Sequence, residues 1–289
     1  MSTLQDDRVT ERNTRAVEGI RSLLVHVEGS VEASPRLHVA VDLARKLDAT
    51  LLGAGVEMFQ PISDPYGMLG GEWLTGMQQI VDEDLQRAEA TFRAHSSGLR
   101  TEWLGVESIP ARALARLSRC ADLIVAGGAP LKMRDSNLTA DTAELVMLSG
   151  RPVLVAPPAG AKFRGDAVVV AWKDTRESRR AVADGLPLLK AAEEVVVLEV
   201  CEVGSLEDAA VNTTDVVHYL RRHGVTARGK TVAANSTLVA TAIENEARTI
   251  GADLIVAGAY GHSRLGEWAF GGVTHDLLHR PERFVLLSH

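Results

Sequence analysis

The sequence has little cysteine and no excess of basic charge. Its 289 residues include two cysteines, Cys120 and Cys201, which form no CxxC pair and no Cys/His metal spacing. Neither a disulfide framework nor a structural zinc site is therefore indicated, and we expect both thiols to be reduced. The formal net charge of -7 argues against binding to nucleic acid, which needs a basic surface to displace counterions from phosphates.

Long apolar runs are also missing. The longest are of the kind AVVVAW (167–172), well short of the roughly 18 to 20 residues that span a bilayer. The first residues, MSTLQDDRVTERNTRAVEG, are polar and carry acids, so they resemble neither a secretory signal nor a transit peptide. We expect a cytoplasmic protein with no membrane partner.

The composition that remains is that of an ordinary globular protein. Hydrophobic residues make up 46% of the chain and charged residues 24%. A length of 289 residues suits two domains of about 140 residues, close to the commonest domain size. The chain is long enough to bury a substantial core.

An internal repeat divides the chain into halves. The heptapeptide ADLIVAG occurs at 121–127 and again at 252–258. Around it, each half repeats the same order of short Val/Ile/Leu runs and stretches with apolar residues at three- and four-residue steps. This alternation predicts parallel strands, buried on both faces, with crossover helices between them.

The predicted fold class is therefore α/β, with two tandem Rossmann-like domains, each a five-stranded parallel sheet flanked by helices. We expect a polar N-terminal segment at 1–20, a first domain at 21–158 and a second domain at 166–289. The stretch APPAGAKFRGD between them has the prolines and glycines of a linker.

A glycine-rich stretch follows the second ADLIVAG copy. Residues 258–272 read GAYGHSRLGEWAFGG and come at the carboxyl end of a predicted strand, where parallel sheets bind ligands. Glycines there let backbone N–H groups approach a phosphate, and a following helix N-terminus adds a favourable dipole. The stretch is not a Walker A loop, and no GxGxxG follows either first strand. Gly229-Lys230-Thr231 lacks the required preceding glycine and lies in a predicted strand.

Beyond roughly its first twenty residues, the chain resembles the universal stress protein family in its tandem two-domain form. Nucleotide-binding members carry G-x2-G-x9-G-[S/T] after the fourth strand, and Gly258, Gly261 and Gly271 match that spacing. The resemblance implies an adenine nucleotide alpha hydrolase-like fold with strand order 3-2-1-4-5 in each domain. It also implies a stress-responsive regulatory protein that binds ATP or AMP in the second domain, with Mg²⁺ as a candidate companion.

The resemblance also implies roles for individual residues. Gly258 and Gly261 would line the ribose and phosphate side. The phosphates would be bound by Gly271, Gly272, Val273 and Thr274, with His262 and Arg264 beside them. The adenine would rest near Ala171, Trp172, Lys173 and Val200.

The two halves depart from the family pattern in different ways. The second has Lys173 where the family usually has an acid, and Gly272 where it has a hydroxyl that Thr274 could replace. The first keeps an acid, Glu28, but has Pro130 and Ala140 in place of the second and third motif glycines. Proline has no N–H and alanine adds a Cβ, so we predict that the first half does not bind ATP in the same way.

Two classes of function stay open. One is a regulatory binding module, and the alternative is a slow ATP hydrolase or nucleotidyl-transfer enzyme on the same fold. No nucleophile and base signature is present, so we assign no catalytic residues and no metal ligands. The resemblance further implies that the last strands of the halves pair edge to edge, as family dimers do, here as an intramolecular pseudo-dimer that covers two otherwise exposed edges. A further homodimer and a protein partner, for which the 58–77 segment is a candidate lid or surface, remain open.

Overall fold

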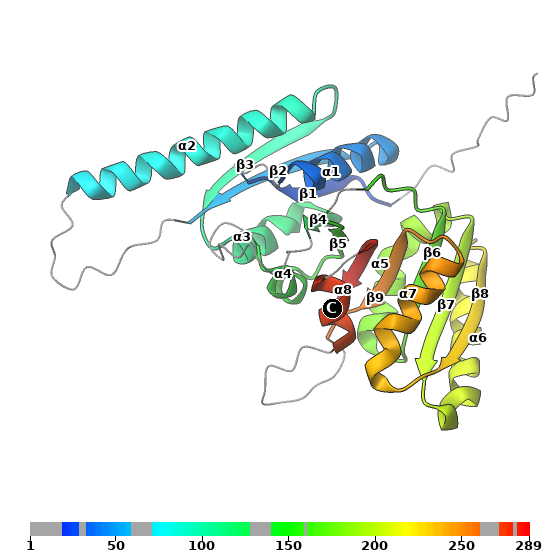
Figure 1. Ribbon diagram of the computed structural model, residues 1–289. Helices are drawn as coiled ribbons and strands as arrows, with labels where there is room; N and C mark the ends of the chain where they lie inside the picture. Colours follow the sequence, from blue (N-terminus) through cyan, green and yellow to red (C-terminus); the bar gives the residue numbers. More distant parts are fainter. Residues whose placement is uncertain are drawn as a thin grey trace, which may run out of the picture.

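The computed structural model describes residues 19–28, 33–58, 71–127, 140–158, 161–260, 272–279 and 282–289. Figure 1 shows two halves side by side, each a sheet covered by helices. The elements of the first half are β1 (Ser22–His26), α1 (Ala33–Leu47), β2 (Thr50–Glu57), α2 (Gly71–His95), β3 (Thr101–Glu107), α3 (Pro110–Leu117), η1 (Ser118–Cys120), β4 (Leu123–Gly127), α4 (Thr142–Ser149) and β5 (Val153–Ala156). Those of the second are β6 (Ala167–Trp172), α5 (Arg176–Ala191), β7 (Glu194–Cys201), η2 (Val203–Ser205), α6 (Leu206–Arg222), β8 (Ala227–Ala233), η3 (Ser236–Leu238), α7 (Val239–Thr249), β9 (Leu254–Gly258), α8 (Gly272–His279) and β10 (Phe284–Ser288).

The strands form one continuous ten-stranded sheet in the order β3-β2-β1-β4-β5-β10-β9-β6-β7-β8. Within each half the pairing is parallel, and the order is 3-2-1-4-5, as the resemblance implied. The halves meet where β5 and β10 pair antiparallel, with Leu286 opposite Leu154. The predicted edge-to-edge pairing of the last strands is therefore confirmed.

Each face of the sheet carries its own core, and each core runs through both halves. One cluster joins buried residues of α1, α2, α5 and α6, among them Leu37, Phe92 and Leu189. The other joins α3, α4, α7 and α8 on the opposite face, with Leu114 and Leu145 fully buried. Continuous apolar strands make this possible, because alternate side chains enter opposite cores.

Local signals set the helix ends. Asp141 caps α4 by accepting hydrogen bonds from the backbone N–H groups of Ala143 and Glu144, and Gly150 ends that helix in the left-handed conformation at φ 58°. Thr175 caps α5 in the same way, accepting from Ser178 N. These short polar caps fix where the crossover helices start relative to the strand ends.

The aspartate of each ADLIVAG copy accepts hydrogen bonds from backbone N–H groups at or just before the first strand of the same half. Asp122 Oδ2 accepts hydrogen bonds from the backbone N–H groups of Arg21 and Ser22, at 2.8 and 3.0 Å. The corresponding Asp253 accepts from Arg164 and Gly165, at 2.7 and 3.0 Å. The repeated aspartate thus has a structural role at the amino-terminal end of the sheet, opposite to the strand end at Gly258.

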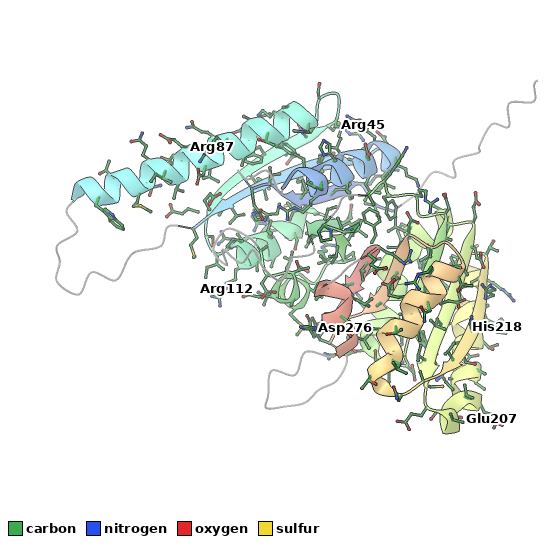
Figure 2. All side chains as sticks on the ribbon, viewed as in Figure 1. Arg45, Arg87, Arg112, Glu207, His218 and Asp276 are labelled. Carbon is green, nitrogen blue, oxygen red and sulfur yellow. The ribbon has the colours of Figure 1, made fainter. Side chains whose placement is uncertain are left out.

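Charged side chains lie on the outer helix surfaces. Figure 2 labels several that point away from the sheet, including Arg45 and Arg87, whose side chains are 52% and 66% exposed. The basic pairs Arg179–Arg180 and Arg221–Arg222 are exposed as well. They lie on solvated helix faces. No helix among the described residues is long and apolar enough to cross a membrane.

One expectation about loops needs correction. The 58–77 segment was expected to lie between a strand and a helix, but α2 already begins at Gly71, so its last seven residues are helical. The apolar residues Trp73 and Met77 stand four apart, and a helix accommodates that spacing as well as a loop does. Residues 59–70 lie outside the described part of the chain.

Candidate functional site

The strand order places a switch point between β6 and β9 in the second half. The chain leaves β6 toward β7 on one side, while β9 and β10 lie on the other. Ala171 near the end of β6 is paired in register with Ala257 of β9, so Gly258 and Lys173 end neighbouring strands at the same edge. Open parallel sheets bind their ligands at the carboxyl ends of strands at this point.

Gly258 closes β9 in a space that leaves no room for a side chain. A Cβ added there would lie 2.5 Å from the carbonyl carbon of Glu177 and 2.5 Å from the backbone N of Ser178. Both atoms belong to the first turn of α5, so only glycine lets this turn and the strand end approach so closely. Two residues later Tyr260 has φ 60°, and the chain turns away from the strand in the left-handed conformation.

The structure brings three residues of the predicted site onto one face. Ala171, Val200 and Val273 are partly buried and pack against the core cluster that α7 and α8 cover, as does Tyr260. They come from β6, β7 and the start of α8, so they surround the strand end from three elements. Thr274, which follows in α8, is 7% exposed.

Two other predicted residues lie differently. Strand alternation turns the Trp172 ring to the opposite face, where it is buried in the cluster with α5 and α6. Lys173 is exposed just beyond the strand. Gly272 begins α8. The remaining predicted residues lie outside the described part of the chain: Gly261, His262, Arg264 and Gly271.

A buried carboxylate at this edge was missed by sequence reasoning. Glu199 of β7 is 8% exposed and is the register partner of Trp172. Burial and the nearby charge of Asp174 raise its pKa, against a hydrogen bond with Asn212 and the charge of Lys173. Its position follows from alternation, because Val195 and Val197 enter the same core, so the pattern EVVVLEVC could have identified it.

The turn after Gly258 also lies close to the first half. Burial raises the pKa of Tyr260 to about 12, and the charge of Asp141, the cap of α4, contributes. The residues at the end of β10 lie beside the same turn. His289 Nδ1 lies 3.0 Å from the Ala259 carbonyl oxygen, and the Ala259 backbone N–H donates a hydrogen bond to the Ser288 carbonyl oxygen. The candidate site thus borders on both halves of the chain.

Comparison with known proteins relates the second half of the chain to one family. Residues 166–289 match the model of the universal stress protein family. A search of curated proteins finds no match.

Solved structures match the fold of the whole chain. A universal stress protein from Archaeoglobus fulgidus has a TM-score of 0.67 at 16% identity, covering 92% of this chain and 95% of its own. A functionally unknown protein from Pseudomonas aeruginosa has a TM-score of 0.57 at 16% identity, covering 94% and 93%. The chain therefore has the fold of a tandem universal stress protein. A universal stress protein solved in complex with cAMP matches 47% of this chain and 97% of its own at 21% identity, with a TM-score of 0.35.

The first half of the chain has a charged strand end. The acid Glu28, which follows β1, is 7% exposed, and its Oε1 lies 3.2 Å from both His26 Nδ1 and Arg36 Nη2. Burial pushes the pKa of Glu28 upward, but the Arg36 charge and the His26 hydrogen bond outweigh it and bring the pKa to about 2. Ala140, in the place of a motif glycine, is buried, and Pro130 lies outside the described residues.

The acidic and histidine side chains near α8 bear on metal binding and acid–base chemistry. Within the described ranges, no group of three or more His, Cys, Asp or Glu side chains could hold a metal ion. His275 and Asp276, adjacent on α8, have Nδ1 and Oδ1 3.6 Å apart, and their side chains are 46% and 63% exposed. That distance is longer than a hydrogen bond.

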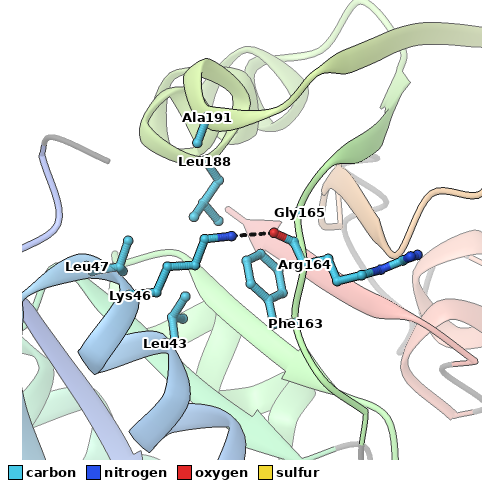
Figure 3. Close-up of a pocket in the computed structure, with 8 residues that line it drawn as sticks. All are labelled: Leu43, Lys46, Leu47, Phe163, Arg164, Gly165, Leu188 and Ala191. Carbon is cyan, nitrogen blue, oxygen red and sulfur yellow. Dashed lines mark hydrogen bonds between the residues drawn. The ribbon is translucent and has the colours of Figure 1, made fainter. Parts of the chain in front are cut away.

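A small cavity lies where the halves join, between α1, α5 and the linker (Figure 3). It encloses about 10 Å³, room for about one water molecule. Lys46 donates a hydrogen bond across it to the Arg164 carbonyl oxygen and lies 5.6 Å from the centre of the Phe163 ring. It is a packing gap at the junction and far too small for a nucleotide.

Proposed function

We propose that the second half binds an adenine nucleotide, ATP or AMP, and that the protein is a stress-responsive regulatory binding protein of the cytoplasm. The observation that carries the proposal is the space at Gly258. A Cβ there would meet main-chain atoms of Glu177 and Ser178 at 2.5 Å. The packing of α5 thus keeps the end of β9 without a side chain of its own, as in turns whose main chain approaches a phosphate.

The surroundings of that strand end support a nucleotide in particular. Ala171, Val200 and Val273 offer partly buried apolar surface from three elements, which suits one face of a purine. Lys173 is exposed at the end of β6, where its charge would attract phosphates. The helix α8 starts at Gly272, so its first N–H groups and its dipole would favour an anion.

The same groups favour binding over turnover. They are main-chain, apolar and cationic groups, which hold and orient a nucleotide without activating a nucleophile. The alternative, slow hydrolysis or nucleotidyl transfer on the same fold, predicts steady phosphate release from ATP and Mg²⁺. A binding module predicts stoichiometric occupancy without such release.

The proposal is tested by the nucleotide that the protein carries. Purified full-length protein is denatured, and the released small molecules are identified by mass spectrometry for the wild type, Gly261→Val and Gly271→Val. We expect AMP or ATP from the wild type and at least a tenfold loss in both variants. Gly204→Val is the matched control, because a Cβ at Gly204 meets nothing within 4 Å. An empty wild type that also fails to bind added ATP would refute the proposal, as would variants that retain nucleotide.

A further inference from the structure

Strand register gives the candidate site a counterpart in the first half. The two ADLIVAG strands pair with the first strand of their own half in the same way, Leu123 with Leu23 and Leu254 with Val168. Counting along each strand from these pairs matches Ala171 with His26, Lys173 with Glu28, and Gly258 with Gly127. The first half thus has three residues in the positions where the proposed nucleotide site lies in the second.

One arginine touches all three of these counterparts. Arg36, in the first turns of α1, donates from Nε to the His26 carbonyl oxygen at 3.0 Å. Its Nη2 lies 3.2 Å from Glu28 Oε1. Its Nη1 lies 2.9 Å from the point that a Cβ on Gly127 would occupy. Each of the three guanidinium nitrogens therefore lies against one residue at the carboxyl ends of β1 and β4.

The group is buried, so its charges act strongly on one another. Arg36 is 9% exposed, and His26 and Glu28 are 2% and 7% exposed. A second carboxylate, Glu57 at the end of β2, is 5% exposed; burial and the charge of Glu28 raise its pKa, which the charge of Arg87 lowers. A cation therefore suits this strand end, and the phosphates of a nucleotide would face two carboxylates there.

The second half is built differently at the same position. Next to Gly258 lie main-chain atoms of Glu177 and Ser178 and the Cβ of Glu177, and no arginine among the described residues lies as near. The residue at the Glu28 position is Lys173, and it is exposed. The first half therefore has an arginine side chain on the carboxylate at the end of β1. The second half has an exposed lysine at the end of β6, with the carboxylates Glu177 and Glu199 buried nearby.

We propose that Arg36 is a built-in occupant of the strand-end site of the first half, and that the chain consequently binds one nucleotide rather than two. The second clause rests on the proposed function, whereas the occupancy by Arg36 does not. Arg36 acts as a ligand supplied by the chain itself: it satisfies Glu28, caps the end of β1 and fills the space beside Gly127.

The occupancy is tested by deleting the side chain and supplying its head group in solution. We expect Arg36→Ala to lower the thermal midpoint of the full chain by several degrees, because Glu28 loses its buried partner. Millimolar n-propylguanidinium should restore part of that loss, and n-propylammonium should restore less, since it lacks the planar fork. Arg45→Ala, on the same helix but with a half-exposed side chain, should show neither loss nor rescue.

Two results of this experiment would show that Arg36 does not occupy the strand end. An unchanged midpoint in Arg36→Ala, or equal effects of n-propylguanidinium on Arg36→Ala and Arg45→Ala, would overturn the occupancy. Where Arg36→Ala does not fold, Arg36→Lys takes its place, with a smaller loss and the same preference for the guanidinium expected. A lack of that preference would also overturn it.

The stoichiometry is tested on the wild type alone. Nucleotide-free full-length protein is titrated calorimetrically with ATP and Mg²⁺, and we expect saturation at one ATP per chain. Saturation at two would overturn the inference and leave the proposed function standing. An absence of binding would refute the proposed function and with it the stoichiometry, and the rescue experiment would still decide the occupancy by Arg36.

Discussion

Among single residues, Gly258 makes the sharpest prediction because its neighbours are main-chain atoms that cannot rotate away. Gly258→Ala places a Cβ 2.5 Å from Glu177 and Ser178 backbone atoms, so either α5 or β9 must shift. We expect a loss of about 1–3 kcal/mol in the free energy of unfolding, measured by urea denaturation, together with weaker nucleotide binding.

Gly76→Ala is the control for this substitution. A Cβ at Gly76 meets nothing within 4 Å, and the residue is exposed in the helix α2. Alanine should therefore stabilise the protein by up to about 1 kcal/mol through helix propensity. Equal effects of the two substitutions would show that Gly258 is not packed against α5 as described.

Glu28 predicts a pH dependence. Its pKa falls from 4.5 to about 2 in the folded protein, so the folded state holds the charged form more tightly than the unfolded chain does. This stabilisation is present in full above about pH 4.5 and is lost as the pH falls toward 2. The shift corresponds to about 3 kcal/mol as an upper limit.

We therefore expect the wild type to exceed Glu28→Gln in unfolding free energy at pH 7, and the gap to narrow as the pH falls from 4.5 toward 2. Denaturant titrations at several pH values measure it. Glu102→Gln, at an exposed position of β3, should show little dependence. A gap that stays constant down to pH 2.5 would be inconsistent with an ionised, paired Glu28.

Among the secondary-structure elements, β4 and β9 make the same contact in the two halves: an aspartate just before each strand accepts hydrogen bonds from the backbone just before β1 or β6. Asp253 fastens the linker through the N–H groups of Arg164 and Gly165. Without the carboxylate, the two backbone N–H groups lose their acceptor. Asp253→Ala should therefore lower the free energy of unfolding by about 2–3 kcal/mol. Hydrogen exchange should also quicken at Arg164 and Gly165. Asp215→Ala, on the exposed surface of α6, should change neither quantity, and a similar loss there would contradict the assignment.

The elements themselves could be predicted because their signals are local. The ADLIVAG repeat located β4 and β9, and the alternation of apolar runs with helical stretches predicted parallel strands with crossover helices. The strand order and the pairing of β5 with β10 came from the family resemblance, and that pairing covers two otherwise exposed edges. The position of Glu28 and Lys173 at matching strand ends was likewise predicted and agrees with the register.

What the sequence could not show is long-range side-chain placement. Arg36 lies in an ordinary amphipathic helix, and its contact with Glu28 and Gly127 depends on how α1 packs over the strand ends. The influence of Asp141 on Tyr260 crosses from one half to the other. No periodicity or motif in the sequence predicts either of these two contacts. The roles of Gly261, His262, Arg264 and Gly271 remain predictions.

The whole molecule is held by one sheet and two cores that both cross the junction. No domain boundary interrupts the hydrogen bonding from β5 to β10, and Phe163 of the linker packs against Phe284 with ring centres 5.1 Å apart. We therefore expect the halves to unfold together. Native-state hydrogen exchange should give the slowest amides of β4 and β9 the same opening free energy. Values that differ by more than about 2 kcal/mol would show that the halves unfold separately.

We propose that the second half binds an adenine nucleotide at the ends of β6 and β9, while Arg36 occupies the corresponding strand end of the first half. A crystal structure of the full chain grown with saturating ATP and Mg²⁺ tests it most directly. We predict density for one nucleotide, with its phosphates beside the turn after Gly258 and its base near Ala171 and Val200, and an undisturbed Arg36–Glu28 pair. An empty strand end at Gly258, or a nucleotide in place of Arg36, would contradict the account.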